Sequence, residues 1–254
     1  MSTAIPAHAR ALTVLLAVGA AGCAAASEEV VVSAAASLRP ALEEAARAYA
    51  GDGGARVLVN AASSSSLARQ IVEGAPVDVF ISADAAQMAA VARAGRIVAG
   101  TRVDLLSNQL ALVAPAGGSL DIESLADLAD PDVRRIGMGD PAAVPVGVYA
   151  RELLEAHGLW ERLREKVVPG GSVEMTLAAA ESGNVDVAFV YLTDARRSRR
   201  VRILMTITAG QGPRIVYPAA VVTGGRNQAG GRRFLEYLSG EGRAVLAAHG
   251  FGTP

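Results

Sequence analysis

The chain has 254 residues, of which 51% are apolar and 19% are charged, and its formal net charge at pH 7 is −1. A charge this close to zero speaks against a nucleic-acid-binding protein and against one that lies on an anionic membrane surface. The length suits one large or two small α/β domains of roughly 100–200 residues each. Few aromatic residues and 27 glycines indicate close packing of helices on sheets.

Residues 1–27 are expected to form an export signal. The apolar run Ala11–Ala21 is too short to span a bilayer and has the proportions of the central region of a signal peptide. The single cysteine, Cys23, follows it in a stretch that resembles a bacterial lipobox, except that Ala20 stands where a leucine is usual. Lipidation of Cys23 and ordinary cleavage after residues 24–26 both remain open. A chain with one cysteine has no internal disulfide, so its stability is expected to come from its core.

Strands alternate with helices along the first half of the chain. Short apolar runs predict strands at 30–33, 56–59 and 77–81. Ser37 is expected to cap the helix after the first strand, with Pro40 in its first turn, where the missing N–H group costs nothing. Asp84 is expected to cap the helix after the third strand, because Gln87 follows three residues later.

A run of four serines, Ser63–Ser66, joins the second strand to a helical pattern that begins at Leu67. Serine hydroxyl groups are hydrogen-bond donors, and so are the first backbone N–H groups of a helix, which have no intrahelical partner. The helix dipole adds partial positive charge at the same point. Such a turn can bind an anion without any lysine or arginine.

The second half of the chain repeats this pattern. Further strands are predicted at 110–114, 136–138, 185–191, 201–207 and 215–223. Helices are expected to start near Val146 and Val173, and two more, at about 228–238 and 241–249, finish the chain. Strands that alternate with helices indicate an α/β fold with parallel sheets, in which ligands bind beyond the carboxyl ends of the strands.

Most enzyme and metal-site classes lack their residues in this sequence. The three histidines and the single cysteine have no zinc-binding spacing, and there is no Gly-Lys-Ser/Thr phosphate loop. A serine hydrolase is an alternative, although the Gly-x-Ser-x-Gly elbow is missing. We therefore expect no cofactor and no enzymatic activity. The arginine-rich segment 196–200 is interpreted as a solvated turn between two strands.

Five segments carry a resemblance to a known family. They are AAASL at 34–38, ASSSSLARQI at 62–71, GAPVDVFISAD at 74–84, GDPAAVPVGVYA at 139–150 and VYPAAVV at 216–222. In these segments, which lie in the same order, the chain resembles the molybdate-binding periplasmic proteins of ABC importers, over essentially all of its mature length.

The resemblance implies the type II periplasmic binding protein fold. This is an α/β fold of two lobes, each a mostly parallel sheet flanked by helices, joined by a two-stranded hinge. Lobe I would comprise residues 28–108 and 219–254. Lobe II would comprise residues 109–218, with hinge crossings near 109–113 and 215–220.

The resemblance also implies a set of ligand-binding residues. The hydroxyl donors of the family fall on Ser37, Ser64 and Tyr191, and its two backbone N–H donors fall on Val146 and Val173. Val146 stands where the family has alanine. Because that contact is made by the main chain, the change matters only if the larger side chain crowds the cleft.

The function implied is capture of molybdate, and of the similarly sized tungstate, in the periplasm or cell envelope, followed by delivery to an ABC permease of the inner membrane. Molybdenum would be present only within the oxoanion, with no direct protein ligand, and the chain is expected to be a monomer. A regulator domain of the same fold is opposed by the export signal and by the lack of a DNA-binding segment.

Hydrogen bonding predicts part of the selectivity. A pocket made only of donors rejects hydrogen phosphate, because its proton would face another donor, and an unmet buried polar group costs ~1–3 kcal/mol. Sulfate carries no proton, so pocket size must exclude it. A receptor for another tetrahedral oxyanion such as sulfate therefore remains an alternative.

Overall fold

A computed structural model describes Met1 and residues 29–208 and 210–254 of the chain. The expected export signal, with Cys23, lies outside these residues apart from Met1. The described strands are β1 (Val30–Ala35), β2 (Val57–Ala62), β3 (Val79–Ile81), β4 (Val103–Asn108), β5 (Leu110–Pro115), β6 (Ile136–Gly139), β7 (Val167–Gly170), β8 (Val187–Tyr191), β9 (Val201–Ile207) and β10 (Ile215–Val221).

The described helices lie between and after these strands. They are α1 (Arg39–Gly51), α2 (Ser64–Val72), α3 (Ala85–Arg93), α4 (Pro145–Ala156), α5 (Trp160–Leu163), α6 (Val173–Glu181), α7 (Leu192–Arg197), α8 (Gln228–Ser239) and α9 (Arg243–Ala248), with short 3-10 turns η1 (Ala36–Leu38), η2 (Leu125–Ala129) and η3 (Arg164–Lys166). None of them is long and apolar enough to cross a membrane.

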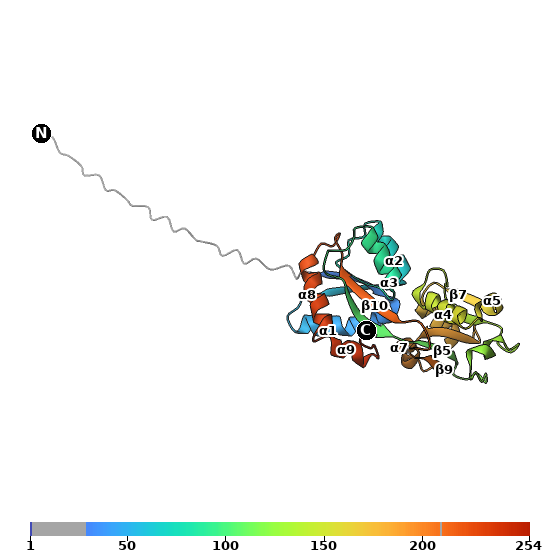
Figure 1. Cartoon of the computed structure of the whole chain (residues 1–254). Helices are drawn as coiled ribbons and strands as arrows, with labels where there is room; N and C mark the ends of the chain where they lie inside the picture. The colour runs from blue at the N-terminus through green and yellow to red at the C-terminus, as the bar shows by residue number, and fades with distance from the viewer. Residues whose placement is uncertain (2–28, 209) are drawn as a thin grey trace.

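The described chain forms two lobes that lie side by side (Figure 1), each built on a five-stranded sheet. The strand order is β2-β1-β3-β10-β4 in lobe I and β7-β6-β8-β5-β9 in lobe II. The expected two-lobed α/β architecture is confirmed. Helices α1, α2, α3, α8 and α9 belong to lobe I, and α4 to α7 belong to lobe II.

Each sheet is mostly parallel, as expected from the sequence, with one strand that runs against the other four. In lobe I, β1 runs parallel to β2 and β3, but β10 runs antiparallel to β3 and β4. In lobe II, β6 runs parallel to β7 and β8, but β5 runs antiparallel to β8 and β9. The antiparallel pairs arise because the chain leaves lobe I through β4 and returns through β10, which must run the other way.

Two segments connect the lobes. The first crossing is at Gln109, between the end of β4 at Asn108 and the start of β5. The second crossing lies between Ile207 and Ile215, because Ile215 already pairs with Asn108 in the sheet of lobe I. The expected crossing near 215–220 is therefore too late in the chain. The apolar run of β10 is continuous and carries no signal of the sheet that it joins.

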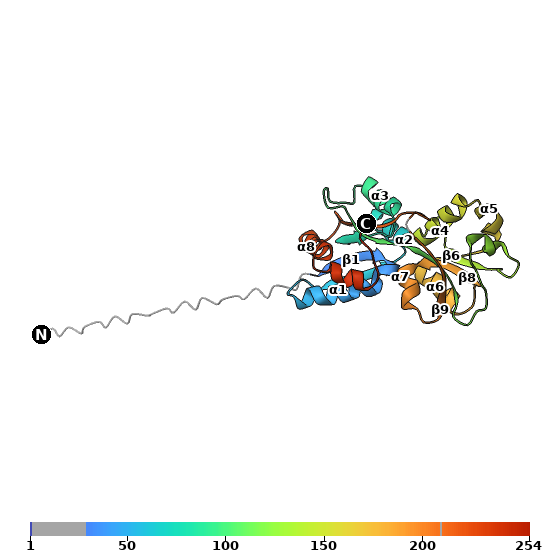
Figure 2. The ribbon, with the colours of Figure 1, turned by 60° about the horizontal axis from the view of Figure 1, so that its bottom comes forward.

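Both faces of the lobe I sheet are covered by helices, which explains why its central strands are apolar at consecutive positions. On β10, Ala219 and Val221 pack in a core with residues of α1, α8 and α9. The next residues, Ala220 and Val222, face the opposite side and pack with α2 and α3. Figure 2 shows the two helical layers on either side of the sheet. This alternation follows from the two-residue period of a strand.

The larger core is continuous between the lobes. Leu38 of lobe I belongs to the same buried cluster as Val146 and Tyr191 of lobe II. The structure describes a closed arrangement, because Ala35 at the carboxyl end of β1 and Tyr191 at that of β8 line one small cavity between the lobes.

Candidate functional site

Several strand ends and helix starts meet between the lobes around a small cavity of about 20 Å³, which we call the cleft cavity. Its lining consists of Ala35, Ala36, Ser37, Ser63, Ser64 and Ala83 from lobe I and Val144, Pro145, Val146, Val173 and Tyr191 from lobe II. A cavity needs about 10–15 Å³ to hold one water molecule. Pockets for drug-sized organic ligands have volumes of about 300–1,000 Å³. The size suits a single small ion rather than an organic molecule.

All five residues expected to bind the ligand line this one cavity. We call the hydroxyl groups of Ser37, Ser64 and Tyr191, together with the backbone N–H groups of Val146 and Val173, the donor cage. These residues come from five separate parts of the chain, and the fold brings them together at one point. Their role as ligand contacts remains a prediction.

Ser64 is the first residue of α2, after Ser63, which caps the helix by accepting a hydrogen bond from Ser66 N at 3.3 Å. The Ser64 Oγ accepts a hydrogen bond from Ala83 N at 2.9 Å. Because a backbone N–H can only donate, the hydroxyl proton of Ser64 is not used in this contact. It is free to donate into the cleft cavity.

Ser37 is buried in the turn η1, and its Oγ lies 3.0 Å from Tyr217 Oη. It is not the cap of α1, as expected from sequence: the residue in that position is Leu38, and no side chain caps the helix. The expectation is wrong because η1 continues directly into the helix. The hydroxyl group instead meets a tyrosine 180 residues further along the chain, which a local sequence rule cannot register.

The main-chain donors of the cage stand at two helix starts. Val146 is the second residue of α4 and Val173 is the first of α6. Neither amide donates to another described residue, as expected for the first turn of a helix. Ser172 caps α6 by accepting a hydrogen bond from Met175 N at 3.3 Å. Both helix dipoles therefore direct partial positive charge at the cleft cavity.

Close packing positions the start of α4. A Cβ atom on Gly147 would lie 1.9 Å from the carbonyl oxygen of Gly139 at the end of β6. Only glycine permits this approach. The helix start therefore lies directly against the end of the strand.

Tyr191 ends β8 and supplies the remaining hydroxyl group. Its Oη is buried and has no hydrogen-bond partner among the described residues. Such orphaned groups are rare in native proteins and cost ~1–3 kcal/mol. Burial raises the pKa of Tyr191 well above 10, so the hydroxyl keeps its proton and can donate. The cavity thus contains a donor that lacks an acceptor.

Among the residues that the structure describes, no charged side chain and no histidine lines the cleft cavity. Asp84, next to the lining, caps α3 as expected, accepting a hydrogen bond from Gln87 N at 2.7 Å. Within the described residues, no group of His, Cys, Asp and Glu side chains could hold a metal ion. The ring of His157 contacts a main-chain carbonyl and that of His249 contacts Glu44, so neither is paired with a serine as a hydrolase would require.

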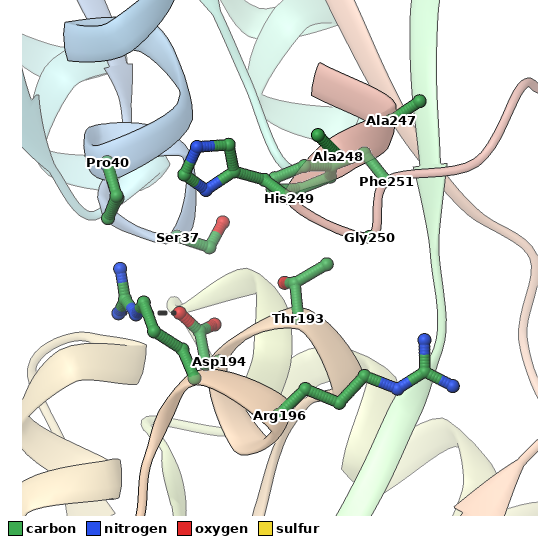
Figure 3. A pocket seen from close by; sticks show the side chains of 11 residues that line it. Ser37, Pro40, Thr193, Asp194, Arg196, Ala247, Ala248, His249, Gly250 and Phe251 are labelled. Carbon is green, nitrogen blue, oxygen red and sulfur yellow. Dashed lines mark hydrogen bonds and ion pairs between the residues drawn. The ribbon is translucent and has the colours of Figure 1, made fainter. Parts of the chain in front are cut away.

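A larger cavity of about 450 Å³ also borders Ser37 (Figure 3). Its lining includes Arg196 and the ion pair between Arg197 Nη2 and Asp194 Oδ1, 3.3 Å apart. Asp194 is almost fully buried, and burial raises its pKa to about 7, partly opposed by Arg197. These residues belong to α7, so the expected solvated turn at 196–200 is wrong in its first two residues, which are helical.

Comparisons with known proteins agree over most of the chain. A family described as bacterial extracellular solute-binding protein matches residues 30–252. The molybdate-binding protein ModA of Haemophilus influenzae is 36% identical over 247 residues, which are 94% of this chain and 96% of the relative. The putative ABC transporter substrate-binding lipoprotein YvgL of Bacillus subtilis is 36% identical over 221 residues, 86% of this chain and 84% of the relative.

A solved structure extends the likeness to the fold. The periplasmic molybdate-binding protein of Azotobacter vinelandii matches this structure with a TM-score of 0.79 at 26% identity. The match covers 89% of this chain and 99% of that chain.

Proposed function

Because this chain belongs to the family of bacterial extracellular solute-binding proteins, we propose that it captures molybdate outside the cytoplasm and delivers it to an ABC permease. Its relatives are binding proteins of transport systems, and we extend to this chain the ligand that two of them are named for. Tungstate, with nearly the same size and charge, is expected to bind as well.

The observation that carries the proposal is the buried hydroxyl of Tyr191, which has no partner in a cavity made of donors. An occupant must therefore accept hydrogen bonds from several directions at once. A fully deprotonated tetrahedral oxoanion does so with every oxygen. Hydrogen phosphate would direct its own proton at a donor, and the unmet polar group would cost ~1–3 kcal/mol.

The charge of the anion is balanced without a buried cation. The starts of α4 and α6 supply partial positive charge and free N–H groups at the cavity. A buried lysine or arginine would have to lose its hydration shell, which costs several kcal/mol when the cavity is empty. Neutral donors avoid the cost of a buried charge in the unoccupied protein.

Closure of the two lobes is part of the proposed mechanism. The donor cage draws Ser37 and Ser64 from lobe I and Val146, Val173 and Tyr191 from lobe II. A ligand that contacts both halves is bound more tightly in the closed arrangement, so it shifts the population toward that state. The closed form is then the one presented to the permease.

A thermal-shift panel followed by calorimetry tests the proposal. The purified mature chain is mixed with molybdate, tungstate, sulfate or phosphate. A ligand that binds only the folded state raises the melting temperature, and more so at higher concentration. We expect a large shift with molybdate and tungstate and none with phosphate. A shift with sulfate alone would identify sulfate, rather than molybdate, as the ligand. The absence of a shift with all four anions would overturn the proposal.

The proposal includes the state of the chain in the cell. We propose that the mature protein acts as a monomer without a cofactor or an enzymatic activity, and that Cys23 carries a lipid anchor. The lipobox resemblance supports the anchor, and the Bacillus subtilis relative is named a lipoprotein. Partition of the wild-type chain, but not of Cys23→Ala, into detergent would support it. Equal behaviour of the two chains would favour ordinary cleavage.

A further inference from the structure

A chain of hydrogen bonds runs from the hinge to the donor cage. Asn108, the last residue of β4, donates from Nδ2 to Tyr217 Oη at 3.2 Å, and Tyr217 Oη lies 3.0 Å from Ser37 Oγ. Tyr217 stands on β10, is fully buried, and packs its ring against Tyr191 and Phe251 at centroid distances of 5.8 and 5.6 Å. No local sequence pattern gives Asn108 or Tyr217 a role.

The orientation of the Asn108 side chain is fixed by its neighbour. The backbone N–H of Gln109 donates to Asn108 Oδ1 at 2.8 Å, so that atom must be the oxygen. The amide nitrogen therefore points the other way, toward Tyr217 and toward Thr193 Oγ1, which lies 3.0 Å from it. An amide nitrogen only donates, so Tyr217 Oη accepts in this contact.

The direction of the remaining bonds follows from that contact. Tyr217 has one hydroxyl proton, and burial raises its pKa far above the ordinary value, so the proton is retained. Its other polar contact among the described residues is Ser37 Oγ. Because an unmet buried hydroxyl proton is costly, Tyr217 donates to Ser37. Ser37 thus accepts from Tyr217, and its own proton is left for the cleft cavity. The bonds run in one direction, from Asn108 through Tyr217 and Ser37 to the ligand.

We propose that Asn108 and Tyr217 are positioning residues that hold the Ser37 hydroxyl as a donor, and that they thereby make the site prefer unprotonated over protonated tetrahedral oxoanions. The inference rests on the proposed function, since it concerns the same cavity. Without this chain of hydrogen bonds, the Ser37 hydroxyl could turn and accept a hydrogen bond from a protonated ligand. With it, turning would break the bond that Tyr217 donates.

Two substitutions separate this role from simple structural support. Asn108→Asp replaces the donating amide by an acceptor of the same shape. The Tyr217 proton then turns to the new carboxylate, Ser37 donates to Tyr217, and an acceptor faces the cavity. Tyr217→Phe keeps the ring packing but removes the middle link, which leaves Ser37 free to adopt either orientation. Asn108 is only half-buried, so the carboxylate is tolerated there.

The test compares two dianions by calorimetry at a mildly alkaline pH: molybdate, which carries no proton, and hydrogen arsenate, which carries one. Both have the same charge, so the added negative charge of Asn108→Asp acts on both and cancels in the ratio of the two affinities. For each of the two variants we expect the ratio of molybdate affinity to arsenate affinity to fall by roughly tenfold or more relative to wild type.

Two control variants define the background. Thr193→Val removes the other hydroxyl that Asn108 contacts and leaves the hydrogen bonds from Asn108 through Tyr217 to Ser37 intact. Tyr237→Phe removes a tyrosine hydroxyl in α8, outside the lining of the cleft cavity. Neither should change the ratio. If Asn108 and Tyr217 had a purely structural role, each substitution would weaken the binding of both anions by the same factor. The ratio of the two affinities would then also stay unchanged.

The outcomes distinguish the two proposals. If wild type binds molybdate and the ratio falls in Asn108→Asp and Tyr217→Phe alone, the positioning role is supported. If wild type binds molybdate and the ratio stays the same in both variants, the positioning role is overturned and the proposed function stands. If wild type binds no molybdate, the proposed function fails, and the selectivity inferred from it fails as well.

Discussion

Arg39 of α1 and Glu174 of α6 form an ion pair from one lobe to the other, with Arg39 Nε and Glu174 Oε1 3.3 Å apart. The same guanidinium donates from Nη2 to the carbonyl of Ala61 at 2.7 Å, so it is held to lobe I while it contacts lobe II. Glu174 is the second residue of α6, whose start faces the cleft cavity. Arg39 therefore both links the closed lobes and offsets a carboxylate beside the proposed anion site.

Arg39→Met is expected to weaken molybdate binding by about two- to fivefold at low salt. The side chains of the pair are 40% and 39% exposed, and exposed pairs contribute about 0.2–1 kcal/mol. Salt screens such pairs, so the difference from wild type should shrink at high ionic strength. Calorimetry at two salt concentrations measures this. Arg56→Met, which breaks a pair with Glu29 within lobe I, is the control, and a loss that does not depend on salt would contradict the prediction.

Tyr191→Phe is expected to weaken binding and to stabilise the empty protein. The hydroxyl has no partner when the cavity is empty, so its removal relieves a penalty of ~1–3 kcal/mol. With ligand bound, the same change removes a hydrogen bond to a charged group, which is worth about 1.5–3 kcal/mol. Urea unfolding and calorimetry measure the two effects. Adding Ser64→Ala should weaken binding further and leave the fold intact. A Tyr191→Phe protein that is less stable when empty would show that the hydroxyl has a partner in the protein.

Val173→Pro tests the main-chain donor of α6. Proline is well tolerated at the first position of a helix, and the preceding Ser172 is extended, with φ −158° and ψ 167°, as a residue before proline prefers. The substitution should therefore keep the fold while removing one N–H group from the donor cage. We expect an affinity loss of roughly ten- to hundredfold by calorimetry. Val173→Ala keeps the N–H group and should bind nearly as wild type. Equal affinities of the two variants would show that this amide does not contact the ligand.

Asp194→Asn is expected to flatten the pH dependence of stability. The carboxyl pKa has an ordinary value of 3.8 and is raised to about 7 in the fold, so between these values the folded state binds more protons than the unfolded state. The free energy of unfolding then falls as pH rises through that window, by up to about 1.4 kcal/mol per pH unit. Asparagine stays neutral throughout, so the variant should gain stability relative to wild type toward pH 7. Urea unfolding over this range measures the difference, and parallel profiles would contradict the shift.

Local patterns predicted the parts of the site that depend on chain neighbours. Helix α4 begins one residue before Val146, and α6 begins at Val173, because caps and small-residue turns are encoded within a few positions. Strand β9 has the predicted bounds 201–207, since its apolar run is compact. The family resemblance then named five residues that the fold brings to one cavity.

Other features could not be read from the chain because they depend on distant partners. Strand β4 has two exposed residues at its start and only two fully buried ones, so it lacks an apolar run. Its place is set by pairing with β10, more than a hundred residues later. The contacts of Asn108 and Ser37 with Tyr217 depend on the same pairing. A single sequence carries no local trace of such contacts.

The composition of the donor cage limits how the protein can release its ligand. Hydroxyl groups and backbone amides do not change charge near neutral pH, and the pKa of Tyr191 lies well above 10. A change of pH near neutrality therefore does not weaken the hydrogen bonds that the donor cage makes to the anion. Unloading has to be mechanical: the lobes must be drawn apart so that donors from each half lose the anion together. The work of separation then falls to the membrane complex that receives it.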